Sequence, residues 1–141
     1  MNNLDPHTLF SIFEQGDEQI YREHGIEGTL NNPYVLISMC SRGLENYNIM
    51  DQMYIRQYPQ QYRNSRKLIQ FKYFNKLYSY LQRVKVRDLH STYKVGSSYE
   101  VDNVINNLTM LLFYFERIEH YEKCAIIKKI TDKLQQQPVL I

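Results

Sequence analysis

Hydrophobic residues recur every three or four positions along most of this chain, and that spacing predicts amphipathic α-helices. The first helix is expected to begin at Asp5-Pro6, which has the form of an N-cap followed by a first-turn proline, and to run to about Glu23. The second begins in the same way at Asn32-Pro33 and ends near Tyr58, because a proline follows. Gly43, inside this second helix, is expected to weaken or bend it.

Three further helices are predicted in the rest of the chain. The third runs from about Tyr62 to Val84, and a loop follows it, with room for a short extended piece between Val84 and Leu89. Ser97 and Glu100 have the spacing of a capping box, which starts a fourth helix. A turn at about 119–121 leads to a fifth helix that ends near residue 136. The apolar stripe expected on the third helix is Leu68, Ile69, Phe71, Phe74, Leu77, Tyr78 and Leu81.

These elements predict an all-α fold. We expect a single domain, residues 1–141, built as a compact bundle of four to five helices that ends in a helical hairpin at about 98–136. A chain of 141 residues is long enough to bury a core without disulfides or metal. Cys40 and Cys124 each fall inside a predicted helix and are expected to act as small buried hydrophobic residues.

Composition places the chain among soluble proteins, with 43% hydrophobic and 23% charged residues. It has no run of about 18 apolar residues that would predict a transmembrane helix, and its first residues do not resemble a secretory signal. We therefore expect a cytoplasmic protein, in a host cytoplasm or a virion if the origin is viral. The abundance of Tyr, Asn, Ile and Lys is typical of low-GC genomes, including those of phages and large viruses.

The charges are segregated along the chain. Residues 1–55 carry eight acidic and two basic residues, residues 56–95 carry ten basic and one acidic, and residues 96–141 carry five basic and six acidic. The formal net charge of +2 therefore hides an acidic first third and a basic middle. Such segregation also suits head-to-tail self-association, in which unlike faces of two copies meet.

The basic middle interleaves its ten bases with aromatic residues, and two interpretations follow. Bases neutralise phosphates and aromatic rings stack on unpaired nucleobases, which indicates a nucleic-acid-binding accessory protein. Alternatively, the aromatic residues belong to the core, and the bases are solvated, pair with the acidic first third, or bind an acidic protein surface. The bases expected to contact nucleic acid in the first interpretation are Arg63, Arg66, Lys67, Lys72, Lys76 and Arg83.

The C-terminal hairpin is the second candidate for a contact surface. In its last helix Ala125, Ile127 (or Ile126), Ile130 and Leu134 recur at helical spacing and are expected to face the preceding helix. Tyr121 is expected to pack over the turn. The side chains expected to remain on the outside are Glu119, Glu122 and Lys123.

The stretch YEKCAIIKKITDKL, residues 121–134, resembles the UVR motif, a short helical hairpin of the nucleotide-excision proteins UvrB and UvrC and of some protease adaptors. In that family the hairpin binds another protein and performs no chemistry, so the resemblance implies docking. The chain departs from the family pattern at two positions. The later aliphatic residue of the pattern is Ile130, one position early, and Thr131 stands where that residue usually lies. Cys124 stands where alanine is usual. The same residues also fit a well-formed helix pair. The residues that carry the resemblance are Tyr121, Glu122, Cys124, Ala125, Ile127 and Leu134.

The sequence contains no enzyme motif that we recognise: neither a phosphate-binding glycine loop, nor a dinucleotide fingerprint, nor a nucleophile elbow. Among the scattered histidines, only His120 has potential metal ligands close by, Glu116 and Cys124, and a turn is expected between them. Asp88, His90 and Ser91 are sequence neighbours, which rarely form a triad. We expect no enzymatic activity, no cofactor, no metal and no small-molecule substrate.

The sequence therefore predicts a non-enzymatic protein-interaction or assembly module, with a nucleic-acid-binding accessory protein as the alternative. A protein partner or a second copy is expected, and a membrane is not. The contact residues come from the basic third helix and from the hairpin. They are Tyr58, Tyr62, Arg63, Arg66, Lys67, Tyr73, Tyr80, Arg83, Glu119, Glu122 and Lys123.

Overall fold

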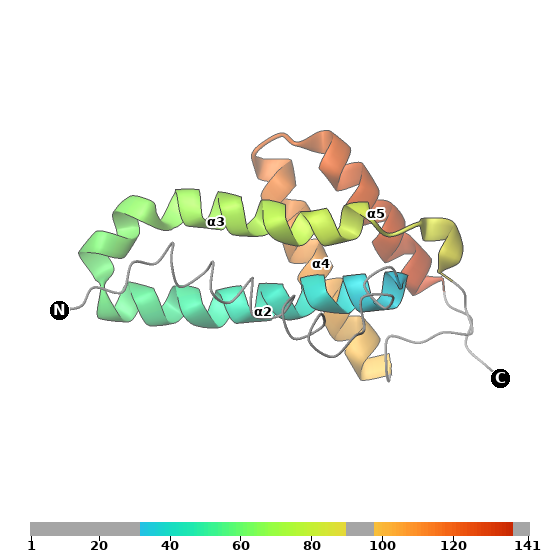
Figure 1. Ribbon diagram of the computed structural model, residues 1–141, viewed down its shortest axis with the longest axis horizontal. Helices are drawn as coiled ribbons and strands as arrows, with labels where there is room; N and C mark the ends of the chain where they lie inside the picture. The colour runs from blue at the N-terminus through green and yellow to red at the C-terminus, as the bar shows by residue number, and fades with distance from the viewer. Residues whose placement is uncertain (1–31, 90–97, 137–141) are drawn as a thin grey trace.

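A computed structural model of the chain describes residues 32–89 and 98–136 (Figure 1). Within these ranges all regular structure is helical and no β-strand occurs, so the prediction of an all-α bundle is confirmed. The first predicted helix and the capping residue Ser97 lie outside the described residues. The elements in chain order are α2 (Pro33–Gln57), α3 (Pro59–Gln82), the short 3-10 helix η2 (Val86–Asp88), α4 (Ser98–Arg117) and α5 (Tyr121–Gln135).

Helices α2 and α3 form a long antiparallel hairpin joined by one residue, Tyr58. At the start of α2, the side-chain oxygen of Asn32 accepts a hydrogen bond from the N–H of Tyr34 at 2.9 Å, which is the N-cap that the sequence predicted. At the turn, Tyr58 leaves the helical conformation, with φ −135° and ψ 59°. Pro59 then starts α3 three residues earlier than predicted, because proline is well suited to the first turn of a helix.

Gly43 lies where α2 and α3 approach each other closely. A Cβ atom at this position would overlap the side chain of Leu77 of α3. The glycine, which costs helix stability in isolation, therefore allows tight packing between the two helices.

Helices α4 and α5 form a second antiparallel hairpin that crosses the first (Figure 1). α4 packs on α2, and α5 packs on α3 and η2. The ends of α2 and α3 that meet at Tyr58 extend beyond α4 and α5 in this view. The core formed where the hairpins cross includes Leu44, Phe74, Leu108, Leu111, Phe115, Ile127, Ile130 and Leu134.

The segment after α3 contains η2 rather than the extended piece considered from the sequence. Val84 and Leu89 are buried, on either side of this single helical turn. No helix of the described residues is both long and apolar enough to cross a membrane.

Candidate protein-interaction surface

The turn between α4 and α5 forms an exposed corner of the second hairpin. Glu119 adopts a left-handed conformation, with φ 64°. Its N–H donates to the carbonyl of Glu116 at 3.1 Å, and the N–H of His120 donates to the carbonyl of Phe115 at 2.9 Å. These two bonds form a Schellman motif, which ends a helix and usually has glycine at the left-handed position.

His120 connects this corner to α3. Its ring stacks on Phe115 with 5.9 Å between centroids, and it lies edge-on to Phe71 of α3 at 6.0 Å. A contact between the residue after the left-handed position and the last turn of the helix commonly accompanies a Schellman motif. The two segments that the sequence singled out, the basic third helix and the hairpin, therefore meet at this point.

Lys123 makes a second connection between the corner and α3. Its ammonium nitrogen lies 4.9 Å from the ring centroid of Phe115 and 5.3 Å from that of Tyr78, and it contacts the side-chain oxygen of Asn75. The prediction that Lys123 lies on the outside is wrong, because cation–π contacts hold this half-buried side chain inward.

Exposed apolar side chains surround the junction. Leu68 and Phe71 of α3 are 50% and 40% exposed, although the sequence placed both in the core stripe. Ile118 and Tyr121 flank His120 in sequence, and Tyr121 is 62% exposed, so it does not cover the turn as predicted. We define the corner surface as these four apolar residues together with three exposed bases of α3. Its residues are Leu68, Phe71, Ile118, Tyr121, Arg63, Lys67 and Lys72.

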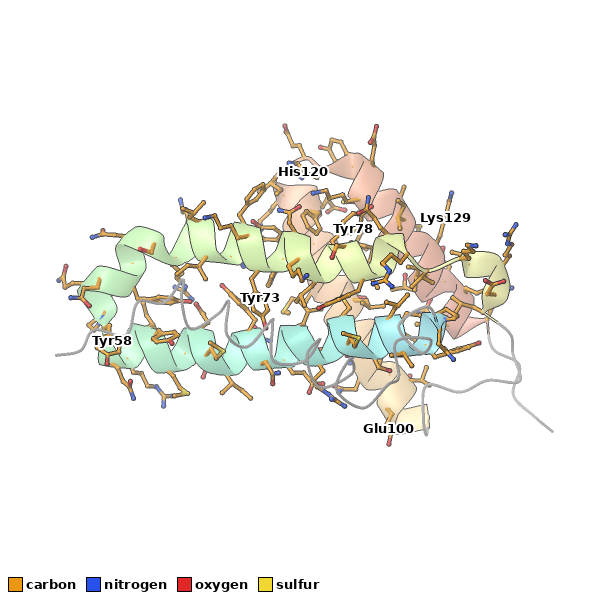
Figure 2. The ribbon with its side chains drawn as sticks, in the orientation of Figure 1. Tyr58, Tyr73, Tyr78, Glu100, His120 and Lys129 are labelled. Atoms are coloured by element: carbon orange, nitrogen blue, oxygen red, sulfur yellow. The ribbon has the colours of Figure 1, made fainter. Side chains whose placement is uncertain are left out.

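Three tyrosines predicted to contact a partner are instead buried. Tyr62 is inaccessible to solvent, and Tyr73 and Tyr80 are nearly so. Figure 2 shows Tyr73 between α2 and α3, whereas Lys129 points away from α5. The prediction is wrong for these residues because helical spacing alone does not distinguish a tyrosine that packs its ring inside from one that presents it to a partner. Tyr58, at the turn of the first hairpin, is half-buried.

Arg66 belongs to a polar cluster between α2 and α3. Its guanidinium donates to both carboxylate oxygens of Asp51, at 2.8 and 2.7 Å, and the hydroxyl of Tyr62 donates to the same carboxylate at 2.6 Å. This pairing is the one that the alternative interpretation foresaw between the basic middle and the acidic first third. The hydrogen bond to Asp51 raises the pKa of Arg66. Two effects raise the pKa of Tyr62: burial is the larger, and the hydrogen bond to Asp51 comes second.

A groove of about 350 Å³ lies beside this ion pair, between α2, α3 and α4. Burial raises the pKa of Tyr47, one of its lining residues. The groove is also lined by Asn48, Asp51, Arg66, Gln70, Phe74, Met110, Tyr114 and Arg117.

The remaining predicted contact residues divide by exposure. Arg83, Glu119 and Glu122 are exposed, as are Arg63 and Lys67 of the corner surface. Lys76 is half-buried, and its ammonium lies 5.7 Å from the ring centroid of Tyr80. Of the bases proposed for nucleic acid, Arg66 and Lys76 are thus engaged with other side chains of this chain.

The inner side of α5 differs from the predicted one at two positions. Ile127, Ile130 and Leu134 are buried as expected, but Ala125 is exposed and Thr131 is buried in its place. The hydroxyl of Thr131 donates to the carbonyl of Lys128 at 3.0 Å, which satisfies a buried polar group within the helix.

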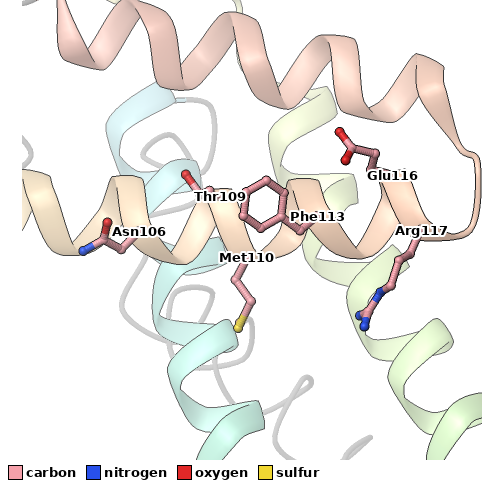
Figure 3. A pocket seen from close by; sticks show the side chains of 6 residues that line it. All are labelled: Asn106, Thr109, Met110, Phe113, Glu116 and Arg117. Atoms are coloured by element: carbon pink, nitrogen blue, oxygen red, sulfur yellow. The ribbon is translucent and has the colours of Figure 1, made fainter.

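A second exposed apolar site lies on α4. Phe113, which is 58% exposed, lines a hollow of about 460 Å³, whereas Met110, which also lines it, is half-buried and points away from Phe113 towards α2 (Figure 3). The other residues of this face are polar or carry opposite charges: Asn106, Thr109, Glu116 and Arg117. This face of α4 therefore lacks the excess of basic residues that the corner surface has.

Among the residues that the structure describes, no group of three or more His, Cys, Asp or Glu side chains could hold a metal ion. His120 and Cys124 are separated from Glu116 by the expected turn. Burial raises the pKa of both Cys40 and Cys124, which disfavours the reactive thiolate form.

The fold and the surface together define a helical-bundle protein in which four exposed apolar residues, Leu68, Phe71, Ile118 and Tyr121, lie near exposed bases of α3 and the turn between α4 and α5. Comparison with protein-family models found no match, and comparisons with curated proteins and with solved structures found none either.

Proposed function

We propose that this protein is a non-enzymatic interaction or assembly module that docks on another protein through the corner surface. The observation that carries the proposal is the exposure of Leu68, Phe71 and Tyr121 around the Phe71–His120 contact, within a charged rim. Exposed aromatic and aliphatic groups inside a polar rim are the usual composition of a binding hot spot. Because the corner is fixed to α3 by ring contacts, little conformational entropy would be lost on binding.

The resemblance of residues 121–134 to the UVR hairpin supports the same proposal. In that family the hairpin docks on a protein partner, and here Tyr121 and Glu122, two residues that carry the resemblance, are exposed.

The nucleic-acid alternative retains exposed bases but loses its stacking groups. Arg63, Lys67, Lys72 and Arg83 remain on the surface. The aromatic residues needed to stack on nucleobases are mostly in the core, and among the rings of α3 only that of Phe71 is substantially exposed. Binding to a protein is therefore the better-supported function. The rings that are buried are Tyr62, Tyr73, Phe74, Tyr78 and Tyr80.

Affinity capture from cells that express the protein tests this function. The full chain is compared with the double variant Phe71→Ala/Tyr121→Ala, and captured proteins are quantified by mass spectrometry. We expect at least one protein to be retained by the full chain and reduced about tenfold or more by the variant, since both aromatic anchors are removed. Point variants are preferable to deletion of α5, because that helix supplies Ile127, Ile130 and Leu134 to the core.

The control is Ile49→Ala/Met53→Ala, which removes another pair of exposed apolar side chains, on α2. All three proteins should give the same circular dichroism spectrum and closely similar melting temperatures. Equal loss of the partner in the control, or equal retention in all three proteins, would reject the corner surface as the docking site.

A further inference from the structure

Helix α3 carries five basic residues and no acidic residue along its whole length. Four of the five, Arg63, Arg66, Lys67 and Lys72, are exposed, although Arg66 is paired with Asp51. The first turn of α3 contains no acid, and no side chain caps it, so the partial positive charge of the helix N-terminus adds to the same field. The exposed side of α3 is therefore strongly positive.

The bases border an apolar strip. Arg63, Lys67 and Phe71 are spaced four residues apart and lie along one side of the helix, with Leu68 beside them and Lys72 on the far edge. Leu68 and Phe71 are three residues apart, the spacing of two neighbouring anchors on one helix face. The positive stretch stops at the corner, where Glu119 and Glu122 are exposed.

We propose that the partner bound by the corner surface is an amphipathic α-helix with an acidic polar face, lying along α3. This inference rests on the proposed function and specifies its ligand. The apolar face of the partner covers Leu68 and Phe71, and its acidic side chains pair with Arg63, Lys67 and Lys72 on the two edges of the strip. The exposed acids Glu119 and Glu122 confine the acidic part of the partner to the region over α3.

The helical form of the partner follows from the surface available. A partner that adds a β-strand needs an open sheet edge, and the described residues form no sheet. A helix with apolar residues at positions i, i+3, i+4 and i+7 matches the Leu68–Phe71 spacing and buries both anchors at once. Near Tyr58 the helices of the first hairpin extend beyond α4 and α5 in the view of Figure 1, and Arg63, Lys67 and Leu68 of α3 are exposed.

Binding of designed peptides to the intact protein tests the proposal. The probe is a fluorescein-labelled helical peptide of about 15 residues, ~22 Å long, with Leu and Phe on one face and Glu on the other. Two matched probes have the same composition in scrambled order, or Lys in place of every Glu. Fluorescence anisotropy is measured at low and at physiological salt, beside a single-stranded and a double-stranded oligonucleotide.

We expect the acidic amphipathic probe to bind about tenfold or more tightly than either matched peptide, and its affinity to fall as salt is raised. Lys67→Glu/Lys72→Glu and, separately, Leu68→Ala/Phe71→Ala should each weaken binding about tenfold or more. The control Lys128→Glu/Lys129→Glu makes the same change of charge at two exposed positions of α5 and should leave binding within about twofold.

Four outcomes would overturn the inference. Equal binding of the ordered and scrambled acidic peptides would show attraction between net charges without helical recognition. An equal loss of probe binding in the control Lys128→Glu/Lys129→Glu would also show attraction between net charges alone. Tighter binding of an oligonucleotide than of the acidic probe would indicate that the bases bind nucleic acid. Absence of probe binding at low salt would exclude an acidic helix as the partner.

The proposed function can survive these outcomes. If cellular capture depends on Phe71 and Tyr121 while the acidic probe fails, the corner surface docks a partner of different chemistry. If capture fails as well, both proposals are rejected.

Discussion

Asp51 illustrates how one carboxylate can be stabilised inside a helical hairpin. Its two oxygens accept from the guanidinium of Arg66 and from the hydroxyl of Tyr62, and its side chain is 13% exposed. A carboxylate with several good donors is stabilised in its charged form, but the loss of one donor leaves a nearly buried charge poorly compensated. Arg66 therefore stabilises the fold, although its position in a basic segment suggested a partner contact.

Replacement of Arg66 by Met keeps most of the apolar stem and removes the charge and the donors. We expect Arg66→Met to lower the free energy of unfolding by about 1–3 kcal/mol, because Asp51 retains only the Tyr62 hydroxyl among these donors. The same change at exposed Arg63 should alter stability by no more than about 0.5 kcal/mol. Urea unfolding at neutral pH measures both, and equal effects at the two positions would contradict a structural role for the ion pair.

At the scale of an element, the turn from α4 to α5 places a non-glycine residue in a left-handed conformation. Glu119 makes the backbone hydrogen bond that glycine usually makes in a Schellman motif, and it accepts the steric cost of a Cβ atom there. His120 offsets part of this cost through its ring contacts with Phe115 and Phe71. The corner is thus ordered by packing in spite of unfavourable local conformation.

Glu119→Gly should stabilise the protein by up to about 1 kcal/mol, because glycine adopts positive φ without steric cost. Glu122→Gly, three residues later in the first turn of α5, should destabilise it by about 1 kcal/mol, because there glycine replaces a helix former whose charge suits the helix N-terminus. Thermal unfolding of the two variants measures this difference. A lower melting temperature for Glu119→Gly would contradict the proposed strain at the turn.

At the scale of the whole molecule, tyrosines supply a large part of the core between the hairpins. Tyr47 lies 4.9 Å from Phe74 between ring centroids, and Phe74 lies 4.7 Å from Tyr114, both with near-perpendicular rings. Tyr78 meets Phe115 at 5.6 Å in the same manner. Edge-to-face pairs of this kind stabilise a core beyond the area that they bury.

This tyrosine-rich core predicts alkaline sensitivity. Burial is the main cause that raises the pKa of Tyr47, Tyr62, Tyr78 and Tyr114 above that of an exposed tyrosine, about 10. Because the folded state holds these hydroxyls protonated, their contribution to stability is complete below about pH 10 and is lost as the pH rises towards the folded-state pKa values.

We therefore expect tyrosinate absorbance to rise in two stages, first for exposed tyrosines near pH 10 and then cooperatively with loss of helical circular dichroism. Tyr47→Phe, which removes one late-ionising hydroxyl, should make the alkaline loss of stability shallower. Ionisation of all tyrosines in one gradual step, with helicity retained, would disagree with buried hydroxyls.

Several elements could be predicted from the sequence because their signals are local. The start of α2 was found from Asn32-Pro33, its end from Pro59, and the second hairpin from apolar spacing and a short turn. The candidate site was predicted only in part. Arg63, Lys67, Glu119 and Glu122 were predicted to contact a partner and are exposed, whereas Phe71, which we propose as an aromatic anchor, was assigned to the core.

The sequence by itself determined the helical class and the concentration of bases in α3, because helix periodicity, caps and charge are properties of neighbouring residues. Only the tertiary structure decided which side of each helix is buried. On α3, the stripe of apolar and aromatic residues extends around most of the helix, so the pattern does not show which part faces α2, α4 and α5 and which remains exposed. Packing between the helices buries Tyr62, Tyr73 and Tyr80 and leaves Leu68 and Phe71 at the surface, since burial depends on contacts between residues distant in sequence.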